Sequence, residues 1–336
     1  MPLLEVRDLH TSFFTDAGEV KAVNGVSFNL DRNKVLGIVG ESGSGKSVTA
    51  YSIMQILAST GKIVSGSIKL DGQELVGAGE KVMKTVRGNK VSIIFQDPMT
   101  SLNPTYTIGH QLMEAIVLHT DRDKKQAYDR AVEMLRLVNI NEPEKRMQQY
   151  PFEFSGGMRQ RIMIAMALAC EPDILIADEP TTALDVTIQA QILELMKSLQ
   201  QELGMAIIMI THDLGVVAQL CDEVIVMYAG SICEQGTADE IFYNPCHEYT
   251  KGLMRSIPTA DTAGTKLKPI TGTPIDLLNM PKGCPFAPRC DAAMKICLSE
   301  RCQRMEINEE HAAACWMNVK KGLEDGSIVA EGGDVQ

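Results

Sequence analysis

The sequence predicts an α/β fold whose core is a parallel sheet covered by helices on both faces. Short, continuous apolar runs recur along the chain, as is typical of strands that are buried on both sides. Between two of these runs, apolar residues from Ile188 to Leu199 recur at the spacing of one helix face, which gives the strand–helix–strand order of a parallel sheet. The predicted core strands are Val35–Val39, Val91–Phe95, Ile174–Ala177, Ala206–Ile210 and Val224–Tyr228.

The N-terminal segments and the middle of the chain predict two further layers. Leu3–Ser12, Val23–Leu30 and Ser65–Leu70 alternate apolar with polar residues, as the strands of an antiparallel sheet with one covered face do. Residues of about 97–165 favour helices, and we expect them to form a helical subdomain inserted into the core. The first predicted domain, with both sheets and this insertion, spans residues 1–258.

The composition of the chain changes after Pro258. Thr, Ala, Gly, Asp and Lys dominate the next residues, which is typical of a linker. Five of the nine cysteines then fall between Cys284 and Cys315. We therefore predict a small cysteine-rich C-terminal extension over residues 259–322, followed by a disordered acidic tail over residues 323–336.

Length, charge and hydropathy exclude several classes of protein. The 336 residues, 45% of them hydrophobic, are enough for one large core with an appendage. A formal charge of −11, from 43 acidic and 32 basic residues, lacks the basic surface of a nucleic-acid-binding protein, so we expect no nucleic-acid partner. No apolar run approaches the roughly 20 residues of a membrane-spanning helix. The N-terminus lacks the regions of a signal peptide, which predicts a cytoplasmic protein with reduced cysteines.

A glycine-rich segment between the first core strand and a predicted helix indicates a phosphate site. Its glycines let backbone N–H groups surround phosphates, and the helix N-terminus adds a favourable dipole. Lys46 would reach the terminal phosphates of a nucleotide, and the Ser47 hydroxyl would bind magnesium. The predicted nucleotide-binding residues of this loop are Gly40, Ser42, Gly43, Ser44, Gly45, Lys46 and Ser47.

Two carboxylates follow the core strand Ile174–Ala177. Asp178 and Glu179 therefore lie at the carboxyl end of a parallel strand, where open sheets of this kind bind their ligands. Acidic residues at a strand end are often only solvated turn residues, but their position after a phosphate loop favours a catalytic role. We expect Asp178 to join the magnesium shell and Glu179 to polarise the attacking water.

A Ser-Gly-Gly turn at the start of another predicted helix, Ser155-Gly156-Gly157, offers N–H donors for a further phosphate. Alone it would be an ordinary helix cap. In combination with the two preceding motifs, it resembles the signature of the ABC ATPase superfamily. Met158 stands where that superfamily more often has Gln, although its peptide-importer branch commonly reads Ser-Gly-Gly-Met.

The other markers of the superfamily are present in the expected order. Gln96 matches the glutamine that contacts magnesium or the attacking water, Asp185 matches the D-loop aspartate, and His212 matches the histidine beside the γ-phosphate. Phe13, or its neighbour Phe14, matches the aromatic residue that stacks on adenine. The resemblance implies a P-loop ABC ATPase cassette that binds ATP and Mg²⁺, with Glu179, His212 and Gln96 as its catalytic residues.

The resemblance covers residues of about 3–257 and implies an assembly. Two cassettes of the superfamily face head to tail, so that the phosphate loop of one and the signature of the other enclose each ATP. Because the chain has one cassette and no predicted spanning helix, we expect a second ATPase subunit, in a heterodimer, and two transmembrane permease subunits. The resemblance also implies an extracytoplasmic solute-binding protein and a peripheral position on the cytoplasmic face of the membrane.

Two segments resemble the di- and oligopeptide importer branch in particular. The first is Phe95–Pro104, and the second is His247–Met254, a variant of the branch's C-terminal His-Pro-Tyr-Thr element. Glu248 replaces the proline of that element. Importers of nickel, glutathione and some sugars share this branch, so uptake of di- or oligopeptides is the expected function and another small solute is the alternative.

The cysteines of the extension could bind a metal. Their spacing lacks the two close Cys-x-x-Cys pairs of structural zinc and the short run of ferredoxins, so spacing alone leaves zinc, an iron–sulfur cluster and free thiols open. The peptide-importer branch carries an extension of the type Cys-Pro-Phe-x-x-Arg-Cys that holds a 4Fe-4S cluster. The resemblance implies Cys284, Cys290, Cys297 and Cys315 as its ligands and leaves Cys302 as an extra thiol.

Two other functions use the same cassette. Soluble ABC ATPases of DNA repair or translation usually carry tandem cassettes or long insertions, and this acidic chain has neither. A cassette with a purely regulatory role would be expected to lack Glu179 or His212, and both are present. The sequence therefore favours an ATP-hydrolysing transporter subunit.

Overall fold

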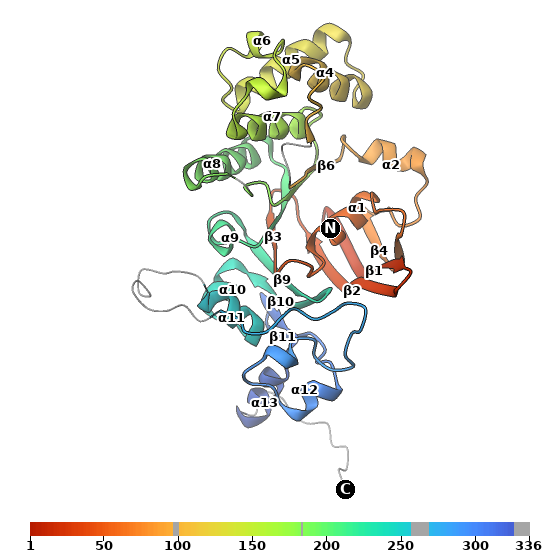
Figure 1. The fold of residues 1–336 in the computed structure, drawn as a ribbon, viewed down its shortest axis with the longest axis vertical. Helices are drawn as coiled ribbons and strands as arrows, with labels where there is room; N and C mark the ends of the chain where they lie inside the picture. Colours follow the sequence, from red (N-terminus) through yellow and green to blue (C-terminus); the bar gives the residue numbers. More distant parts are fainter. Residues whose placement is uncertain (97–100, 183, 257–268, 326–336) are drawn as a thin grey trace.

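The computed structural model describes residues 1–96, 101–182, 184–256 and 269–325. The molecule is elongated, with a group of helices at one end, the cysteine-rich extension at the other, and the two sheets between them (Figure 1). Within these ranges, no helix is both long enough and apolar enough to cross a bilayer.

The central sheet has the strand order β11-β12-β10-β9-β3-β8-β7-β6. Its five strands from β9 to β6 are parallel, and every residue of β3, β7 and β8 is buried. The prediction of a parallel core from continuous apolar runs is confirmed, with strand ends that agree to within one residue. These strands are β3 (Val35–Val39), β6 (Val91–Ile94), β7 (Ile174–Asp178), β8 (Ala206–Thr211) and β9 (Glu223–Tyr228).

Beyond β9 the sheet continues with antiparallel strands that the sequence did not predict. β10 (Ser231–Thr237) follows β9 through a tight turn, and it then pairs with β12 (His311–Ala313) from the C-terminal extension. β11 (Met305–Asn308) completes this edge. The segment His311–Ala313 has too few apolar residues to read as a strand, so its place in the sheet depends on pairing with β10.

A second, antiparallel sheet packs on the core, as predicted from the N-terminal alternation. Its strand order is β2-β1-β4-β5. Helix α1 (Lys46–Met54) lies between the two sheets, and its residues Ile53 and Met54 join the same apolar cluster as both of them. The helix α2 (Glu80–Val86) follows this sheet. The strands are β1 (Leu4–Thr15), β2 (Gly18–Leu30), β4 (Gly61–Leu70) and β5 (Gln73–Glu74).

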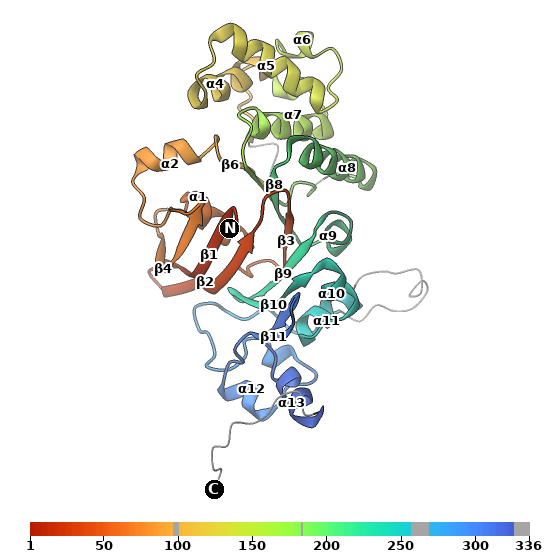
Figure 2. The ribbon, with the colours of Figure 1, turned by 180° about the vertical axis from the view of Figure 1, so that it is seen from behind.

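The helices between β6 and β7 form the end of the molecule that Figures 1 and 2 draw at the top. They agree with the range of about 97–165 that favours helices in the sequence, except that α7 continues to Leu168. Side chains of Thr107, Asp123 and Ser155 cap three of them by accepting backbone N–H bonds. The helices are α4 (Ile108–His119), α5 (Lys124–Leu137), α6 (Pro143–Arg146) and α7 (Gly156–Leu168).

The remaining helices flank the core sheet or belong to the extension. The predicted domain boundary at residues 258 and 259 lies outside the described residues. Residues 326–336 of the predicted tail also lie outside the described residues. The first three residues of that tail, 323–325, are not disordered as predicted but belong to the last helix, which ends at Asp325. These helices are α8 (Val186–Leu203), α9 (Leu214–Leu220), α10 (Ala238–Tyr243), α11 (Glu248–Arg255), α12 (Lys295–Ser299) and α13 (Trp316–Asp325).

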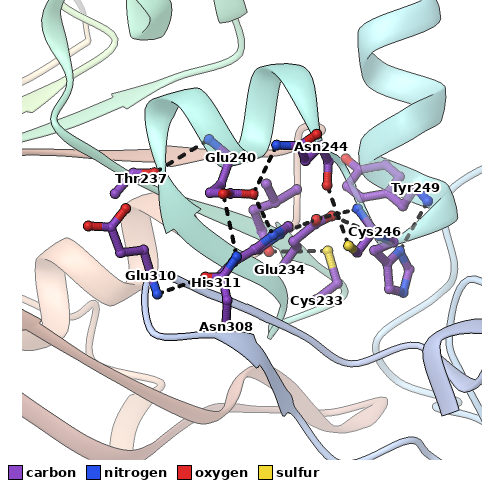
Figure 3. Close-up of polar contacts among 12 residues, drawn as sticks. Cys233, Glu234, Thr237, Glu240, Asn244, Cys246, Tyr249, Asn308, Glu310 and His311 are labelled. Carbon is purple, nitrogen blue, oxygen red and sulfur yellow. Dashed lines mark hydrogen bonds and ion pairs between the residues drawn. The ribbon is translucent and has the colours of Figure 1, made fainter. Parts of the chain in front are cut away.

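A buried ion pair attaches the extension to the sheet (Figure 3). His311 Nε2 on β12 lies 2.7 Å from Glu234 Oε1 on β10, and its Nδ1 lies 3.3 Å from Glu240 Oε2 on α10. The side chains of His311 and Glu234 are 1% and 0% exposed. Backbone N–H groups of Cys246 and His247 also donate to Glu234. These three residues, His311, Glu234 and Glu240, form the His311 clasp, in which the buried Nδ1 of His311 makes no hydrogen bond and faces Glu240 as an ion pair. The possible ligand atoms of Glu234, Cys246 and His311 lie within 4.8 Å of one another.

The strength of the His311 clasp depends on pH in a defined direction. The hydrogen bond to Glu234 raises the pKa of His311, although burial opposes this effect. Burial acts to raise the pKa of Glu234, but hydrogen bonds from His311, Thr250 and two backbone N–H groups lower it. The clasp therefore contributes stability above the ordinary glutamate pKa of about 4.3, and this contribution is lost as pH rises through the raised pKa of His311.

We expect His311→Ala to lower the free energy of unfolding by about 3 kcal/mol at pH 6, because it leaves the Glu234 carboxylate buried without its cation. The difference from the unaltered chain should shrink as pH rises through the raised pKa of His311. Urea unfolding at a series of pH values measures it. An equal loss at pH 6 and pH 9.5 would contradict the charged clasp.

Candidate functional site

The glycine-rich loop joins β3 to α1 and closes tightly on its neighbours. At Gly40, with φ of +152°, a Cβ atom would lie 2.2 Å from the carbonyl oxygen of Met227. At Gly45, with φ of +101°, it would lie 2.4 Å from the carbonyl oxygen of Ala22. Only glycine fits both positions, because any side chain would collide with the backbone. Backbone packing therefore sets the shape of the loop, on which N–H groups at the start of α1 are available to a phosphate.

Lys46, the first residue of α1, turns its side chain back over this loop. Its Nζ donates to the carbonyl oxygens of Gly40, at 2.7 Å, and Glu41, at 3.0 Å. The side chain is buried, and burial lowers the pKa of the Lys46 ammonium group. The cation is therefore held in place at the loop, with neutral carbonyl partners that an anionic phosphate would outcompete.

Asp178 lies directly beneath the loop. Its Oδ1 accepts a hydrogen bond of 2.9 Å from Ser47, and its Oδ2 accepts one of 3.0 Å from Tyr51 on α1. The side chain is buried, which raises the pKa of Asp178. Burial and the adjacent carboxylate raise the pKa of Tyr51 to about 12, so its hydroxyl stays a donor. Sequence patterns did not single out Tyr51, because a tyrosine one turn into a helix carries no motif.

Glu179 contacts residues of two other loops and one residue of its own loop. Its Oε2 accepts hydrogen bonds from Gln96 Nε2 and Thr182 Oγ1, both at 2.9 Å, and its Oε1 lies 3.3 Å from His212 Nδ1. Gln96 follows β6 and His212 follows β8, so parallel strands deliver both to one edge of the sheet. The structure thus brings together the predicted residues Gln96, Glu179 and His212, and it adds Thr182.

The backbone at Glu179 is strained. Its φ is +49°, in the left-handed region that residues other than glycine rarely adopt. Its N–H still donates to the carbonyl oxygen of Ile210, at 2.8 Å, which extends the pairing of β7 with β8 by one residue. The strained residue is therefore the predicted catalytic carboxylate, directly after the end of β7.

Phe13 lies on the inner strand β1, opposite Gly61 of β4. The two residues are paired in the strand register, and the Phe13 ring lies so close to Gly61 that a Cβ atom there would lie 2.7 Å from it. Phe13 is half-buried, while its neighbour Phe14 is exposed. The packing against Gly61 gives Phe13 a fixed ring face, whereas the Phe14 side chain points to the other side of the strand.

The Ser-Gly-Gly turn does not lie at the phosphate loop of the same chain. Ser155 caps α7, and Figures 1 and 2 place α7 next to α8 and away from α1. The turn packs against the start of α8, because a Cβ atom at Gly157 would lie 2.8 Å from Ile188 and one at Gly156 would meet Leu184. Asp185 caps this end of α8. Ala183 of the predicted D-loop lies outside the described residues. These residues form a second surface, apart from the loop that carries Lys46.

Four cysteines of the extension line one pocket. These are Cys284, Cys290, Cys297 and Cys315, the four predicted ligands, and they share the pocket with His247 and Trp316. Burial raises the pKa of Cys284, and the nearby thiols of Cys297 and Cys315 raise it further. Backbone N–H groups, at Phe286 and Ala287 for Cys284 and at Met317 for Cys315, point at the sulfurs and favour their thiolate forms. Cys302 instead lines a neighbouring cavity.

The spacing of these sulfurs bears on the metal that they could hold. Among the described residues, no three cysteine sulfurs lie within 4.8 Å of one another. A tetrahedral zinc ion with Zn–S bonds of about 2.3 Å would bring its sulfurs to roughly 3.8 Å apart. A cluster of four irons separates its thiolates more widely. Four thiols that line one pocket suit a thiolate-bound metal centre, although they are not grouped at the spacing of a single zinc ion.

Comparisons with known proteins match both parts of the chain. Residues 23–182 match the family model of ABC transporters, and residues 233–297 match the model of the oligopeptide/dipeptide transporter C-terminal region. The chain is 54% identical to a dipeptide transport ATP-binding protein, DppD, of Bacillus subtilis (strain 168), over 94% of each chain. It is 55% identical to an oligopeptide transport ATP-binding protein, OppD, of Salmonella typhimurium (strain LT2), over 88% of each chain.

A solved structure agrees with the fold. It is the dimeric post-hydrolysis state of an ATP-binding cassette bound to ADP and Pi, which is 25% identical, with a TM-score of 0.63. The match covers 70% of this chain and 98% of that cassette. The predicted α/β cassette with two sheets and inserted helices is therefore confirmed.

We expect Tyr51→Phe to raise the Mg²⁺ concentration needed for half-maximal ATP hydrolysis about tenfold. The hydroxyl orients Asp178 from behind, and loss of such a partner commonly weakens metal binding by this factor. The ATP requirement at saturating Mg²⁺ should stay the same. Tyr128→Phe, on the distant helix α5, is the matched control, and an unchanged Mg²⁺ requirement in Tyr51→Phe would refute the positioning role.

Proposed function

The chain belongs to the ABC transporter family, and on that premise we propose that it hydrolyses ATP to drive the uptake of di- or oligopeptides across the cytoplasmic membrane. The observation that carries the proposal is the arrangement at the carboxyl edge of the sheet. One strained glutamate, Glu179, meets Gln96 and His212 next to a phosphate loop whose cation, Lys46, is already in place.

The residues of this edge divide the chemistry among them. Lys46 and the loop N–H groups bind the terminal phosphates, while Ser47, Asp178 and Gln96 would hold Mg²⁺. Magnesium bound there would neutralise charge on the β- and γ-phosphates. Glu179 accepts a proton from the water that attacks the γ-phosphate, and His212, 3.3 Å from it, orients the phosphate.

The proposed site is completed by a second ATPase subunit. Ser155, Gly156 and Gly157 start a helix whose N-terminus favours a phosphate, but they lie away from the loop of their own chain. A head-to-tail dimer brings this turn, and Asp185 near it, to the ATP of the partner subunit. The adenine would stack on Phe13. The related dimeric cassette bound to ADP and Pi supports such an arrangement.

The peptide cargo and the membrane partners follow from the relatives. Dipeptide and oligopeptide transport proteins that are more than half identical to the chain, together with the matched C-terminal region, support a peptide importer. The proposed complex contains a different second ATPase, two permease subunits and an extracytoplasmic solute-binding protein. The chain would lie at the cytoplasmic face of the membrane.

We also propose that the extension holds a 4Fe-4S cluster on Cys284, Cys290, Cys297 and Cys315. The support is chemical: four thiols line one pocket, no three described cysteine sulfurs lie within 4.8 Å of one another, and backbone N–H groups point at those of Cys284 and Cys315. Since burial raises the pKa of Cys284, Cys290 and Cys315, these thiols would release protons as the metal binds.

Replacement of the catalytic carboxylate tests the ATPase site. Glu179→Gln should lower ATP turnover in the assembled complex at least about 100-fold, because the amide cannot accept the proton of the attacking water. It should still bind ATP, so nucleotide remains trapped. Turnover and bound nucleotide are measured in the same preparation.

Lys46→Ala is the control for this experiment. It removes the cation that faces the phosphates, so it should lose ATP binding as well as turnover. Normal turnover in Glu179→Gln would refute its role as the base.

Iron and sulfide analysis tests the cluster. Anaerobically purified protein should contain about four irons and four sulfides per chain and absorb broadly in the visible range. Replacing any one of the four ligand cysteines by Ser should lower the iron content. Cys302→Ser, at the adjacent cavity, is the matched control and should keep it.

A colourless protein with stoichiometric zinc would show that the cluster is wrongly assigned. That result would leave the ATPase proposal intact, because the ATP-site residues lie in a different part of the fold.

A further inference from the structure

An arginine from the cysteine-rich extension reaches the phosphate loop. Arg289 ends a short helical turn, Ala287–Arg289, that lies between the proposed ligands Cys284 and Cys290. Its Nη1 and Nη2 donate to the two carboxylate oxygens of Glu41, at 2.5 Å and 2.9 Å. The Arg289 side chain is 5% exposed and that of Glu41 27%. Two parallel hydrogen bonds of this kind fix both distance and orientation.

The arginine is held on every side. Its Nε donates to the carbonyl oxygen of Thr271, at 3.0 Å, and Nη1 also lies 3.3 Å from the Tyr228 hydroxyl. The guanidinium lies 5.8 Å from the ring centre of Tyr228 and 6.0 Å from that of Phe286. With its rotamer restricted in this way, Arg289 moves only when the surrounding segment moves.

The surrounding segment depends on the cysteine pocket. Phe286 and Arg289 both lie between Cys284 and Cys290, and the Phe286 ring packs on Tyr228 and Tyr249 at 5.3 Å between ring centres. Whatever holds the two thiols therefore also places the guanidinium. The same aromatic group touches the loop a second time, because the N–H of Glu41 donates to the Tyr249 hydroxyl, at 2.8 Å.

Charge makes this contact important for nucleotide binding. Glu41 belongs to the loop that receives phosphates, and its own carbonyl oxygen is a partner of Lys46. An unpaired carboxylate there would repel an anionic ligand. Arg289 neutralises that carboxylate through two hydrogen bonds.

We propose that Arg289 is a positioning residue that neutralises Glu41 of the phosphate loop and so transmits the state of the cysteine pocket to nucleotide affinity. The inference rests on the proposed ATP site and adds a connection to it. Coupling between two binding sites is reciprocal. Bound nucleotide should therefore change the binding affinity of the cysteine pocket by the same factor.

Nucleotide affinity of the full-length chain tests the charge argument. Arg289→Gln should weaken binding of a fluorescent ATP analogue about tenfold, because it exposes the Glu41 charge. The double variant Arg289→Gln/Glu41→Gln should bind within about twofold of the unaltered chain. Arg304→Gln is the matched control: it removes an extension arginine that donates to Ser27 and Gln235 and does not touch the loop.

Three results would overturn this part. They are unchanged affinity in Arg289→Gln, a loss in the double variant as large as in the single one, or an equal loss in Arg304→Gln. If the unaltered chain bound no nucleotide, the proposed function would fail instead, so the two failures are distinguishable.

A cysteine variant tests the connection between the sites. Cys290→Ser should weaken nucleotide binding in the unaltered background, with no further effect in Arg289→Gln/Glu41→Gln, because the charge to be neutralised is gone. Cys302→Ser should have no effect in either background. A loss from Cys290→Ser of the same size in both backgrounds would mean that the pocket acts on the ATP site without Arg289, and would overturn the proposal.

Discussion

The parallel alignment of β6, β7, β8 and β3 is the constraint on which the rest of the site depends. Parallel strands end at one edge of a sheet, so residues far apart in the chain meet there. Asp178 ends one of these strands, and Gln96, His212 and the loop from Gly40 come just after the ends of the others. The burial of every residue of β3, β7 and β8 holds this edge rigid, and the strain at Glu179 is supported by its hydrogen bond to Ile210.

Much of this arrangement could be predicted from the sequence, since each core strand is a continuous apolar run and each motif follows a strand end. Val35–Val39 agrees with the structure residue for residue. The parts that could not be predicted depend on partners. Tyr51 and Thr182 matter through single hydrogen bonds to carboxylates, and β12 is a strand because β10 and β11 pair with it.

The C-terminal extension is therefore part of the fold as well as an appendage. It adds two strands to the central sheet, attaches to it through the His311 clasp, and reaches the phosphate loop through Arg289. The variant His-Glu-Tyr element also connects to the phosphate loop. Burial lowers the pKa of His247 to about 4, so its ring is neutral and caps α11 by accepting a backbone N–H bond. The Tyr249 hydroxyl of the same helix accepts the N–H of Glu41. Glu248, which replaces the usual proline, pairs with Lys251 on the surface of that helix and disturbs neither contact.

The central claim is that ATP hydrolysis at this edge of the sheet drives peptide uptake. The most direct measurement is ATP turnover by the complete complex in lipid vesicles, with the solute-binding protein supplied empty, loaded with peptide, or incubated with nickel or glutathione. The account predicts that peptide-loaded binding protein stimulates turnover and that peptide accumulates in the lumen that corresponds to the cytoplasm. Turnover that responds to nickel or glutathione but not to peptide, or that moves no solute, would contradict it.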